Sequence, residues 1–274
     1  MSYILTYDNR PITRTQGAYD FIKYGPDDVW VPVTFSGGKS IHMGSYIWRG
    51  YNSLAEDPIY YNSIYELTSY QTWSTKSWTG LTTFNSQNVW RSTDNRIFFS
   101  NGSSGQYELN GSHWSSMTWG NVSKPERSHI WTDGKYDYYG DTHYRSSITW
   151  YKKSWTWADG RPPYFADNAR TAIWRDTDGT VYYSYGSNQY VMNGSTWSKK
   201  TWNGVTSFEG KYVWHDLSGR TFLSQGTQQY ELNSSTSTWS AKTWGGVTPL
   251  FGNEIWNDGY TMYYTYDYNT YKLT

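Results

Sequence analysis

The chain has 274 residues, with 23 lysines and arginines balanced by 23 aspartates and glutamates, and it has no cysteine. The missing cysteine excludes disulfides, thiolate metal ligands and a cysteine nucleophile, and the zero net charge argues against nucleic acid as a partner, because phosphate contacts need a basic excess. Aromatic residues make up 20% of the chain, so we expect a core of large rings, each burying roughly 150 to 250 Å².

The chain begins without the features of an exported or membrane-inserted protein. Residues 1–8 hold no basic segment followed by an apolar one, so we expect no secretory signal peptide. No stretch approaches the roughly 20 apolar residues of a membrane helix, and we therefore expect no membrane insertion. Residues 11–24 receive no place in the predicted fold.

A tryptophan repeat extends from about residue 48 to the end of the chain. Within each complete unit, two further tryptophans lie five residues apart, as Trp197 and Trp202 do. This spacing is typical of β-propeller blades. The units open with an apolar residue and a tryptophan, at intervals of 42, 41, 43, 40 and 42 residues, at Trp48, Trp90, Trp131, Trp174, Trp214 and Trp256.

Each unit divides into four short β-type runs separated by turn residues. In the unit that starts at Lys211, the predicted strands cover residues 212–215, 221–224, 229–232 and 239–244. Alanine and leucine are scarce and no long helical period survives, so we expect almost no helix. The pattern predicts an all-β fold of four-stranded antiparallel blades.

The two ends of the chain are predicted to share one blade. The last unit opens at Trp256 and stops after its third run, while residues 29–35 resemble the fourth runs at residues 201–208 and 243–251. An N-terminal strand that completes the C-terminal blade would remove two exposed sheet edges. We therefore predict one domain over residues 1–274, a six-bladed β-propeller whose last blade is closed by residues 1–35.

The spacing of tyrosine and tryptophan resembles that of Kelch repeats. Tyr190 precedes Trp197 by seven residues, and the same spacing varies by one or two elsewhere, as between Tyr144 and Trp150. The resemblance implies a propeller and says little about chemistry. Kelch-like propellers include an oxidase whose copper-radical site needs a tyrosine cross-linked to cysteine, which this chain cannot form.

Other candidate groups are better explained by structure than by catalysis. The turns after the first strands carry aspartates that would lie near the axis, but such Asp-Gly and Ser-Gly tetrads form tight turns. The five histidines lack the close spacing of zinc ligands, and no nucleophile elbow, P-loop or dinucleotide loop occurs. The sequence therefore predicts no enzyme, no cofactor and no metal site.

Two connections between consecutive units are long. The tryptophans that flank them are 19 residues apart over 155–174 and 18 apart over 30–48, whereas the other connections keep 12. In a propeller of four-stranded blades both insertions are expected on the same side, and loops on a rigid scaffold often carry recognition. The alternative is that the two loops have lengthened without a function, because a change of loop length costs little free energy. Their anchor-type residues define a candidate interaction face of Trp157, Arg161, Tyr164, Phe165, Lys39 and His42.

The composition resembles that of proteins exposed outside cells, but no export signal accompanies it. A viral particle component would reconcile the two, because it is made in the host cytoplasm and leaves inside the particle. We therefore expect a non-enzymatic virion protein, such as a phage tail, collar or head-fibre component, with other virion proteins and a host-surface glycan or receptor as partners. A carbohydrate-binding propeller lectin and an intracellular Kelch-type adaptor are the alternatives.

Overall fold

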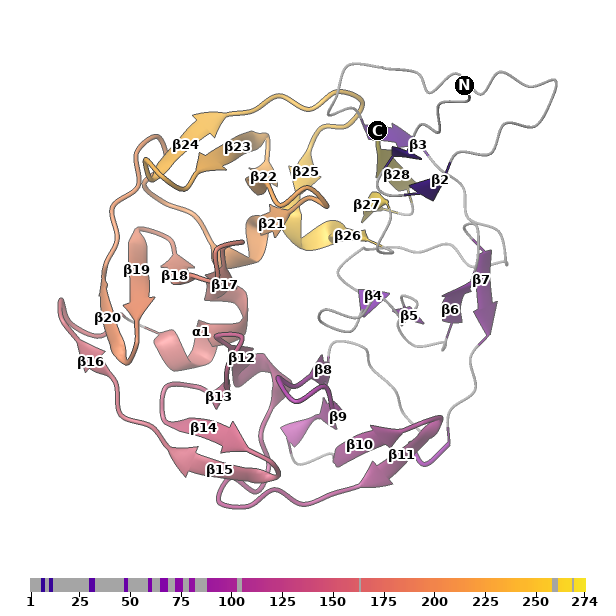
Figure 1. The fold of residues 1–274 in the computed structure, drawn as a ribbon, viewed down its shortest axis with the longest axis vertical. Coiled ribbons are helices and arrows are strands. Elements are labelled where there is room, and N and C mark those ends of the chain that lie inside the picture. Colours follow the sequence, from indigo (N-terminus) through magenta and orange to yellow (C-terminus); the bar gives the residue numbers. More distant parts are fainter. Residues whose placement is uncertain are drawn as a thin grey trace.

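The computed structural model describes residues 79–81, 88–102, 105–162, 164–257, 261–267 and 269–274; for residues 166–168 and the seven strands before residue 79 it describes the backbone alone. The strands pair into small, mostly antiparallel sheets that follow one another around a ring (Figure 1). The protein is an all-β propeller.

Five blades are described, the last of them without the side chains of β3, where the sequence predicts six. The sixth predicted unit, which opens at Trp48, falls where only strand backbones are described, and there β4 (Ile47–Trp48), β5 (Ile59–Tyr60), β6 (Tyr65–Thr68) and β7 (Thr72–Thr75) form a further four-stranded sheet. A two-stranded sheet joins β1 (Thr6–Tyr7) to β2 (Arg10–Pro11). The first two of the five blades consist of β8 (Val89–Arg91), β9 (Ile97–Ser100), β10 (Gln106–Asn110) and β11 (His113–Ser116), and of β12 (Ile130–Thr132), β13 (Asp137–Tyr139), β14 (His143–Ser146) and β15 (Thr149–Lys152). The third consists of β17 (Ile173–Arg175), β18 (Val181–Tyr185), β19 (Asn188–Asn193) and β20 (Thr196–Lys199), with β16 (Thr156–Trp157) at its edge, and the fourth of β21 (Val213–His215), β22 (Thr221–Gly226), β23 (Gln228–Asn233) and β24 (Thr238–Ala241), with β25 (Leu250–Phe251) paired to β22. The fifth consists of β26 (Ile255–Asn257), β27 (Met262–Tyr266), β28 (Asn269–Leu273) and β3 (Trp30–Pro32).

The pairing of the two chain ends that the sequence predicts is present. Strand β3 lies antiparallel to β28, with Trp30 opposite Leu273 and Val31 opposite Lys272. This pairing gives the last blade its fourth strand and covers an edge that β28 would otherwise expose. Whether the whole chain is one domain stays a prediction.

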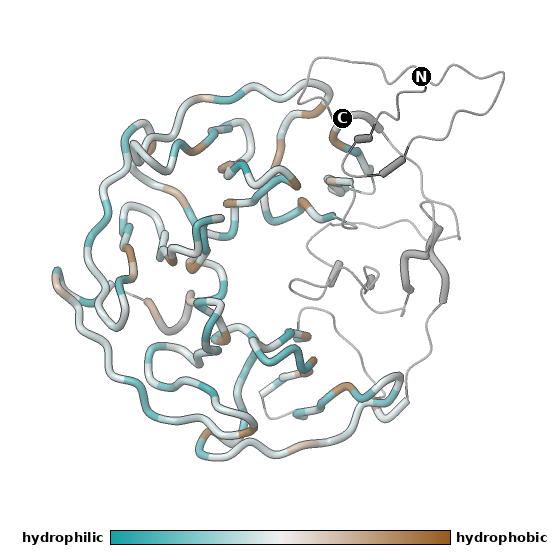
Figure 2. The backbone as a smooth tube through the Cα atoms, viewed as in Figure 1, coloured by the Kyte–Doolittle hydropathy of each residue, from teal (hydrophilic) through white to brown (hydrophobic). Residues whose placement is uncertain are grey.

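Aromatic side chains fill the blades, and a repeated hydrogen bond holds the innermost tryptophans. Trp174 Nε1 donates to Ser184 Oγ at 2.9 Å, and the same bond recurs from Trp90, Trp214 and Trp256 to Ser100, Ser224 and Thr265. A buried indole N–H without a partner would lose stability, so these four units supply a hydroxyl about ten residues on, while Trp131 donates to the carbonyl oxygen of Gly140 at 2.7 Å. Apolar stretches are accordingly short and scattered through the ring (Figure 2), because the core consists largely of Trp and Tyr.

The outer edge of a blade is covered by chain arriving from the preceding blade. Asn203 forms a parallel bridge with Thr238 of β24, and Thr79 and Gly120 do the same on β11 and β15. The approach is close: a Cβ at Gly204 would collide with the carbonyl oxygen of Trp239. This cover blunts edge strands that could otherwise pair with other molecules.

Among the described residues one α-helix interrupts the all-β pattern, which agrees with the sequence-based expectation of almost no helix. Helix α1 (Phe165–Ala172) lies inside the 155–174 connection, where other blades have a 3-10 turn before their inner strand: η4 (Arg127–His129), η5 (Gly210–Tyr212) and η6 (Gly252–Glu254). Phe165, Ala169 and Ala172 follow the helical i, i+4, i+7 spacing and are all fully buried. A single apolar face eight residues long is too short a signal to stand out in the sequence.

The blade β12–β15 departs from the repeat in its core. Arg145 pairs with Trp150 of β15, in the register where Leu109, Met192 and Leu232 pair with the tryptophans of their own blades. The same register places His143, and not Tyr144, at the position of the repeat tyrosine, so the Tyr144–Trp150 spacing used for the Kelch comparison was misaligned by one residue.

Candidate functional site

The connections between blades lie on the same side of the ring as the turns between the second and third strands. Gln189 Nε2 donates to the carbonyl oxygens of Gly186, in such a turn, and Phe208, in a connection, at 2.7 and 3.3 Å. Gln106 and Gln229 make the same pair of bonds in their own blades. The 155–174 insertion therefore belongs to this face, which we call the connection face; the 30–48 insertion lies outside the described residues.

Two of the six predicted interaction residues belong to the core. Phe165 is fully buried against Trp157 and Tyr183. Trp157 is half-buried, because β16 runs parallel to β20 and its indole stacks on Trp197 at 6.1 Å between ring centroids. Phe165 and Trp157 therefore pack within the blade, where the sequence analysis expected binding anchors. Burying such a large ring among other aromatic side chains is more favourable than leaving it in water.

Tyr164 and Arg161 remain at the surface of the connection face. Tyr164 is 65% exposed, adopts a left-handed backbone conformation (φ 58°) at the start of α1, and has its ring 6.5 Å from that of Tyr185. The Arg161 guanidinium is 49% exposed and forms an ion pair with Asp141 at 2.6 Å. Lys39 and His42 lie outside the described residues.

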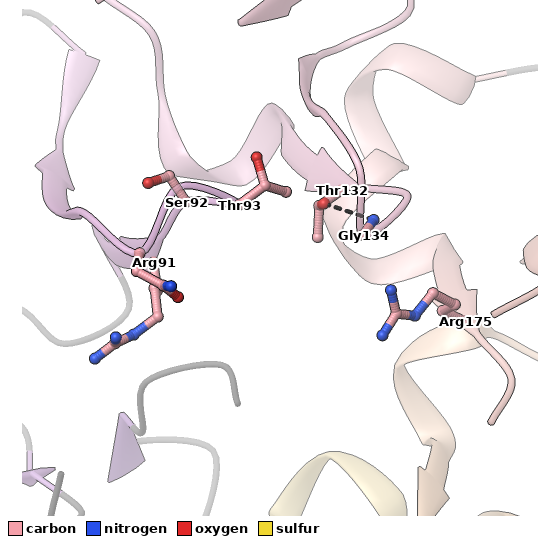
Figure 3. Close-up of a pocket in the computed structure, with 7 residues that line it drawn as sticks. Arg91, Ser92, Thr93, Thr132, Gly134 and Arg175 are labelled. Carbon is pink, nitrogen blue, oxygen red and sulfur yellow. Dashed lines mark hydrogen bonds between the residues drawn. The ribbon is translucent and has the colours of Figure 1, made fainter. Parts of the chain in front are cut away.

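A pocket of about 70 Å³ opens on the opposite side of the ring, among the turns that follow the inner strands. Three successive blades contribute residues to this pocket, and no sequence-based prediction named its two arginines. Arg91 and Arg175 stand on opposite sides of it, with Thr132 and Gly134 between them (Figure 3). Its lining consists of Arg91, Ser92, Thr93, Asn95, Thr132, Gly134 and Arg175.

A sequence signal for this pocket exists in the repeat. The residue after each opening tryptophan is always polar, although the residue before the tryptophan is always apolar, and in the five described blades this polar residue ends the inner strand. The six residues are Arg49, Arg91, Thr132, Arg175, His215 and Asn257, of which Arg49 lies outside the described part.

The aspartates of these turns serve structure, as the turn chemistry of the sequence predicts. Asp133 Oδ1 accepts the backbone N–H groups of Lys135 and Tyr136, and Asp216 Oδ1 accepts those of Ser218 and Arg220. Among the described residues, no group of three or more His, Cys, Asp or Glu side chains is placed to hold a metal ion.

Asp176 also joins two blades. Its carboxylate accepts Thr221 Oγ1 and Ser234 Oγ, both at 2.6 Å, and His215 Nε2 lies 3.8 Å away. Burial alone would raise the pKa of Asp176, but the neighbouring His215 ring and hydrogen bonds from Ser234, Thr221 and the Thr177 amide hold that pKa well below 3.8.

The connection face and the pocket on the opposite side thus belong to a β-propeller, and polar side chains line the pocket. No family model and no curated protein matches the chain. In the part of the chain that the structure describes, no helix is long and apolar enough to cross a membrane.

Several solved structures are similar to the chain. One is the extracellular domain of a protein described as a hybrid two component system from B. thetaiotaomicron, with 10% identity, a TM-score of 0.45, and coverage of 90% of this chain and 40% of that one. The chain thus spans two fifths of the length of this first similar structure. Virginiamycin B lyase from Staphylococcus aureus has 11% identity and a TM-score of 0.45 over 85% of this chain and 97% of its own. A protein described as a gluconolactonase has 12% identity and a TM-score of 0.48 over 90% and 93%. At these identities and TM-scores the likenesses say nothing about activity or partners.

Proposed function

We propose that the protein is a non-enzymatic component of a viral particle, such as a phage tail, collar or head-fibre protein, and that its propeller is a binding platform. On this proposal the partners are other virion proteins and a host-surface glycan or receptor, and the connection face makes the contact. The proposal starts from the composition, which resembles that of proteins exposed outside cells.

The observation that carries the platform role is the surface built by the 155–174 connection. This connection places β16 and α1 where other junctions have a short loop, and fixes both by core contacts of Trp157 and Phe165. Tyr164 projects from this rigid base and is the most exposed of the large hydrophobic side chains described. A preorganised aromatic with a neighbouring arginine suits a binding anchor.

The test uses native particles from the source and the purified full chain. We expect the polypeptide to co-purify with particles, and Tyr164→Ala to weaken its binding to particles depleted of it by about tenfold or more, as loss of an interface anchor does. Tyr136→Ala is the matched control, because Tyr136 is also exposed, at 38%, but lies in a turn at the opposite end of the blades. Particles that lack the polypeptide would refute the proposal.

A carbohydrate-binding lectin is the second candidate, supported by the same exposed ring beside Arg161. A glycan array separates the two, because a lectin would bind a defined sugar and lose it on Tyr164→Ala or Arg161→Ala with folding intact. Trp157→Ala is not a clean probe, since Trp157 stacks on Trp197 within the blade. An intracellular Kelch-type adaptor is third, and capture of a single host protein with an empty glycan array would favour it.

We also propose that the ring has six blades of Kelch-like repeats. The backbone sheet β4–β7 supports the sixth blade, because its strand order matches that of its neighbours and its opening Trp48 keeps the repeat interval. Tyr107, Tyr190, Tyr230 and Tyr271 occupy one register in their blades, which supports the repeat. Top-view electron micrographs of the purified protein would count the blades.

A further inference from the structure

We propose that a row of tyrosines on the blade β12–β15 is a binding site for a short oligosaccharide. The row consists of Tyr136, in the turn before β13, Tyr144 on β14 and Tyr151 on β15, and we call it the tyrosine row. Strands β14 and β15 lie toward the outer rim of the ring (Figure 1). The turn that carries Tyr136 is at the end of the blades opposite the connection face, so the site is separate from Tyr164 and the inference does not depend on the function proposed above.

The three rings contact one another and are partly open to solvent. Tyr144 stands directly opposite Tyr151 in the strand register, with 5.7 Å between the ring centroids. The ring of Tyr136 lies edge-on to that of Tyr144, also at 5.7 Å. Tyr136 is 38% exposed and Tyr151 45%. Apolar residues that stand singly at a surface need no explanation, whereas a contiguous row of rings indicates a contact site.

The fold does not require the two exposed rings. In the blades β8–β11, β17–β20 and β21–β24, small or charged residues take both positions. These residues are Arg96, Thr180 and Arg220 in place of Tyr136, and Ser115, Ser198 and Ser240 in place of Tyr151. Because these blades form without either ring, packing within a blade does not explain the two tyrosines.

The base of the tyrosine row is fixed by the core and by the turn. Tyr144 packs against the buried aromatic cluster that includes Trp131, Tyr138 and Trp197. The amide of Tyr136 donates to Asp133 Oδ1 at 2.6 Å, which holds the turn that carries its ring. A site that is rigid before binding loses less conformational entropy when a ligand arrives.

The area of the row favours a small ligand over a protein. A tyrosine ring can bury roughly 150 to 250 Å², so the exposed fractions leave on the order of 200 Å² for a partner. A stable protein interface needs about 800 Å² from each side. The row is thus too small to hold a protein partner by itself.

The chemistry of the row suits a sugar. A sugar ring carries C–H groups on its faces and hydroxyls around its edge, and the electron-rich faces of tyrosine rings attract the C–H groups while the phenol hydroxyls can bond to the edge. Lys135 Nζ, 5.2 Å from the centroid of Tyr136, adds a hydrogen-bond donor beside the row. Rings side by side can contact consecutive units of a sugar chain.

The test screens the purified full chain on an array that includes cello-, malto- and chito-oligosaccharides, and measures Kd for the strongest binder by titration calorimetry. We expect the wild type to bind at least one of these sugars. Tyr151→Ser, which copies the neighbouring blades, and Tyr136→Thr, which copies Thr180, should each raise Kd by about tenfold or more. Tyr151→Phe keeps the ring and should raise Kd less. Circular dichroism checks that each variant is folded.

Tyr164→Ala is the matched control, because it removes an exposed tyrosine from the connection face and should leave Kd unchanged. Leu217→Ser is a second control, since Leu217 is 48% exposed in a turn of another blade. An array on which the wild type binds no sugar would overturn the proposal. So would a sugar that is lost in Tyr164→Ala and kept in Tyr151→Ser, which is the result that the lectin candidate predicts.

A protein contact at the tyrosine row is the remaining outcome. An empty array together with weaker attachment of Tyr151→Ser to particles depleted of the protein would assign the row to a protein partner and overturn the sugar assignment. Binding of a sugar that is lost in Tyr151→Ser would support the inference even if native particles lack the polypeptide. The failure of this proposal and that of the virion role are therefore distinguishable.

Discussion

At the scale of single residues, Arg145 shows how one blade differs from its relatives. Arg145 Nε and Nη2 donate to Asp137 at 2.8 and 2.7 Å, and both side chains are only 2% exposed. In the blade β8–β11 the two positions hold Leu109 and Ile97, whereas in the blade β21–β24 Thr221 takes the position of the aspartate. The arginine and the aspartate are therefore a paired exchange, and Asp94 of the preceding blade adds a second carboxylate to the arginine.

The first prediction concerns this pair. Arg145→Leu should destabilise the protein by about 3 to 5 kcal/mol, because it leaves the buried Asp137 charge without its cation. The double variant Arg145→Leu with Asp137→Ile, which copies the blade β8–β11, should recover most of the loss. Urea unfolding of the single and double variants measures the coupling. Additive losses in the double variant would contradict the assignment of these residues as a pair.

At the scale of elements, the junctions between blades depend on side chains that reach from one blade to the next. Asp176 follows β17 and accepts hydroxyls from Thr221 and Ser234, which belong to the following blade. Its side chain is 1% exposed. A carboxylate held in this way makes the junction sensitive to acid.

The second prediction follows from the direction of this pKa shift. The folded pKa of Asp176 lies below 3.8, so the stabilisation is complete above 3.8 and is lost as the pH falls through the folded pKa. Asp176→Asn should lower the free energy of unfolding by about 1 to 3 kcal/mol at neutral pH. The difference in free energy of unfolding between the wild type and this variant should shrink by about 1.4 kcal/mol for each pH unit below the unfolded pKa. Urea unfolding at several pH values measures this, with Asp178→Asn in the same turn as the control. A deficit that is constant with pH would count against the role of the Asp176 charge.

At the scale of the whole molecule, the ring depends on the pairing of β3 with β28. These strands come from opposite parts of the sequence and lie side by side in Figure 1. A contact of such sequence separation closes a long loop, so it is entropically costly and should form late in folding.

The third prediction tests the closure with cysteines, which the natural chain lacks. Val31→Cys and Lys272→Cys stand opposite each other, so a disulfide should form on oxidation and shift the protein on a non-reducing gel. The loop-entropy estimate gives a stabilisation of up to about 5 kcal/mol, seen as a rise in Tm that reductant reverses. Val31→Cys with Lys199→Cys, on a different blade, should not cross-link. Equal cross-linking of both pairs would exclude the observed register.

Much of the fold is predictable from the sequence, because blade structure is encoded by short-range patterns. The opening tryptophans, the alternating strands and the turn glycines recur at a fixed period, and the N-terminal run resembles the missing strand of the last unit. Each of these signals depends on residues within one unit of about 40 positions. The repeat therefore determines the strands, the blades and the partner of β3.

Tertiary structure alone decided which side chains are available to a ligand. Phe165 and Trp157 resemble binding anchors in the sequence, but the short face of α1 and the pairing of β16 with β20 bury them. Arg91 and Arg175 belong to different units, and only the curvature of the ring brings them to one pocket. Local pattern specifies which element forms, whereas burial and convergence depend on contacts between elements far apart in the chain.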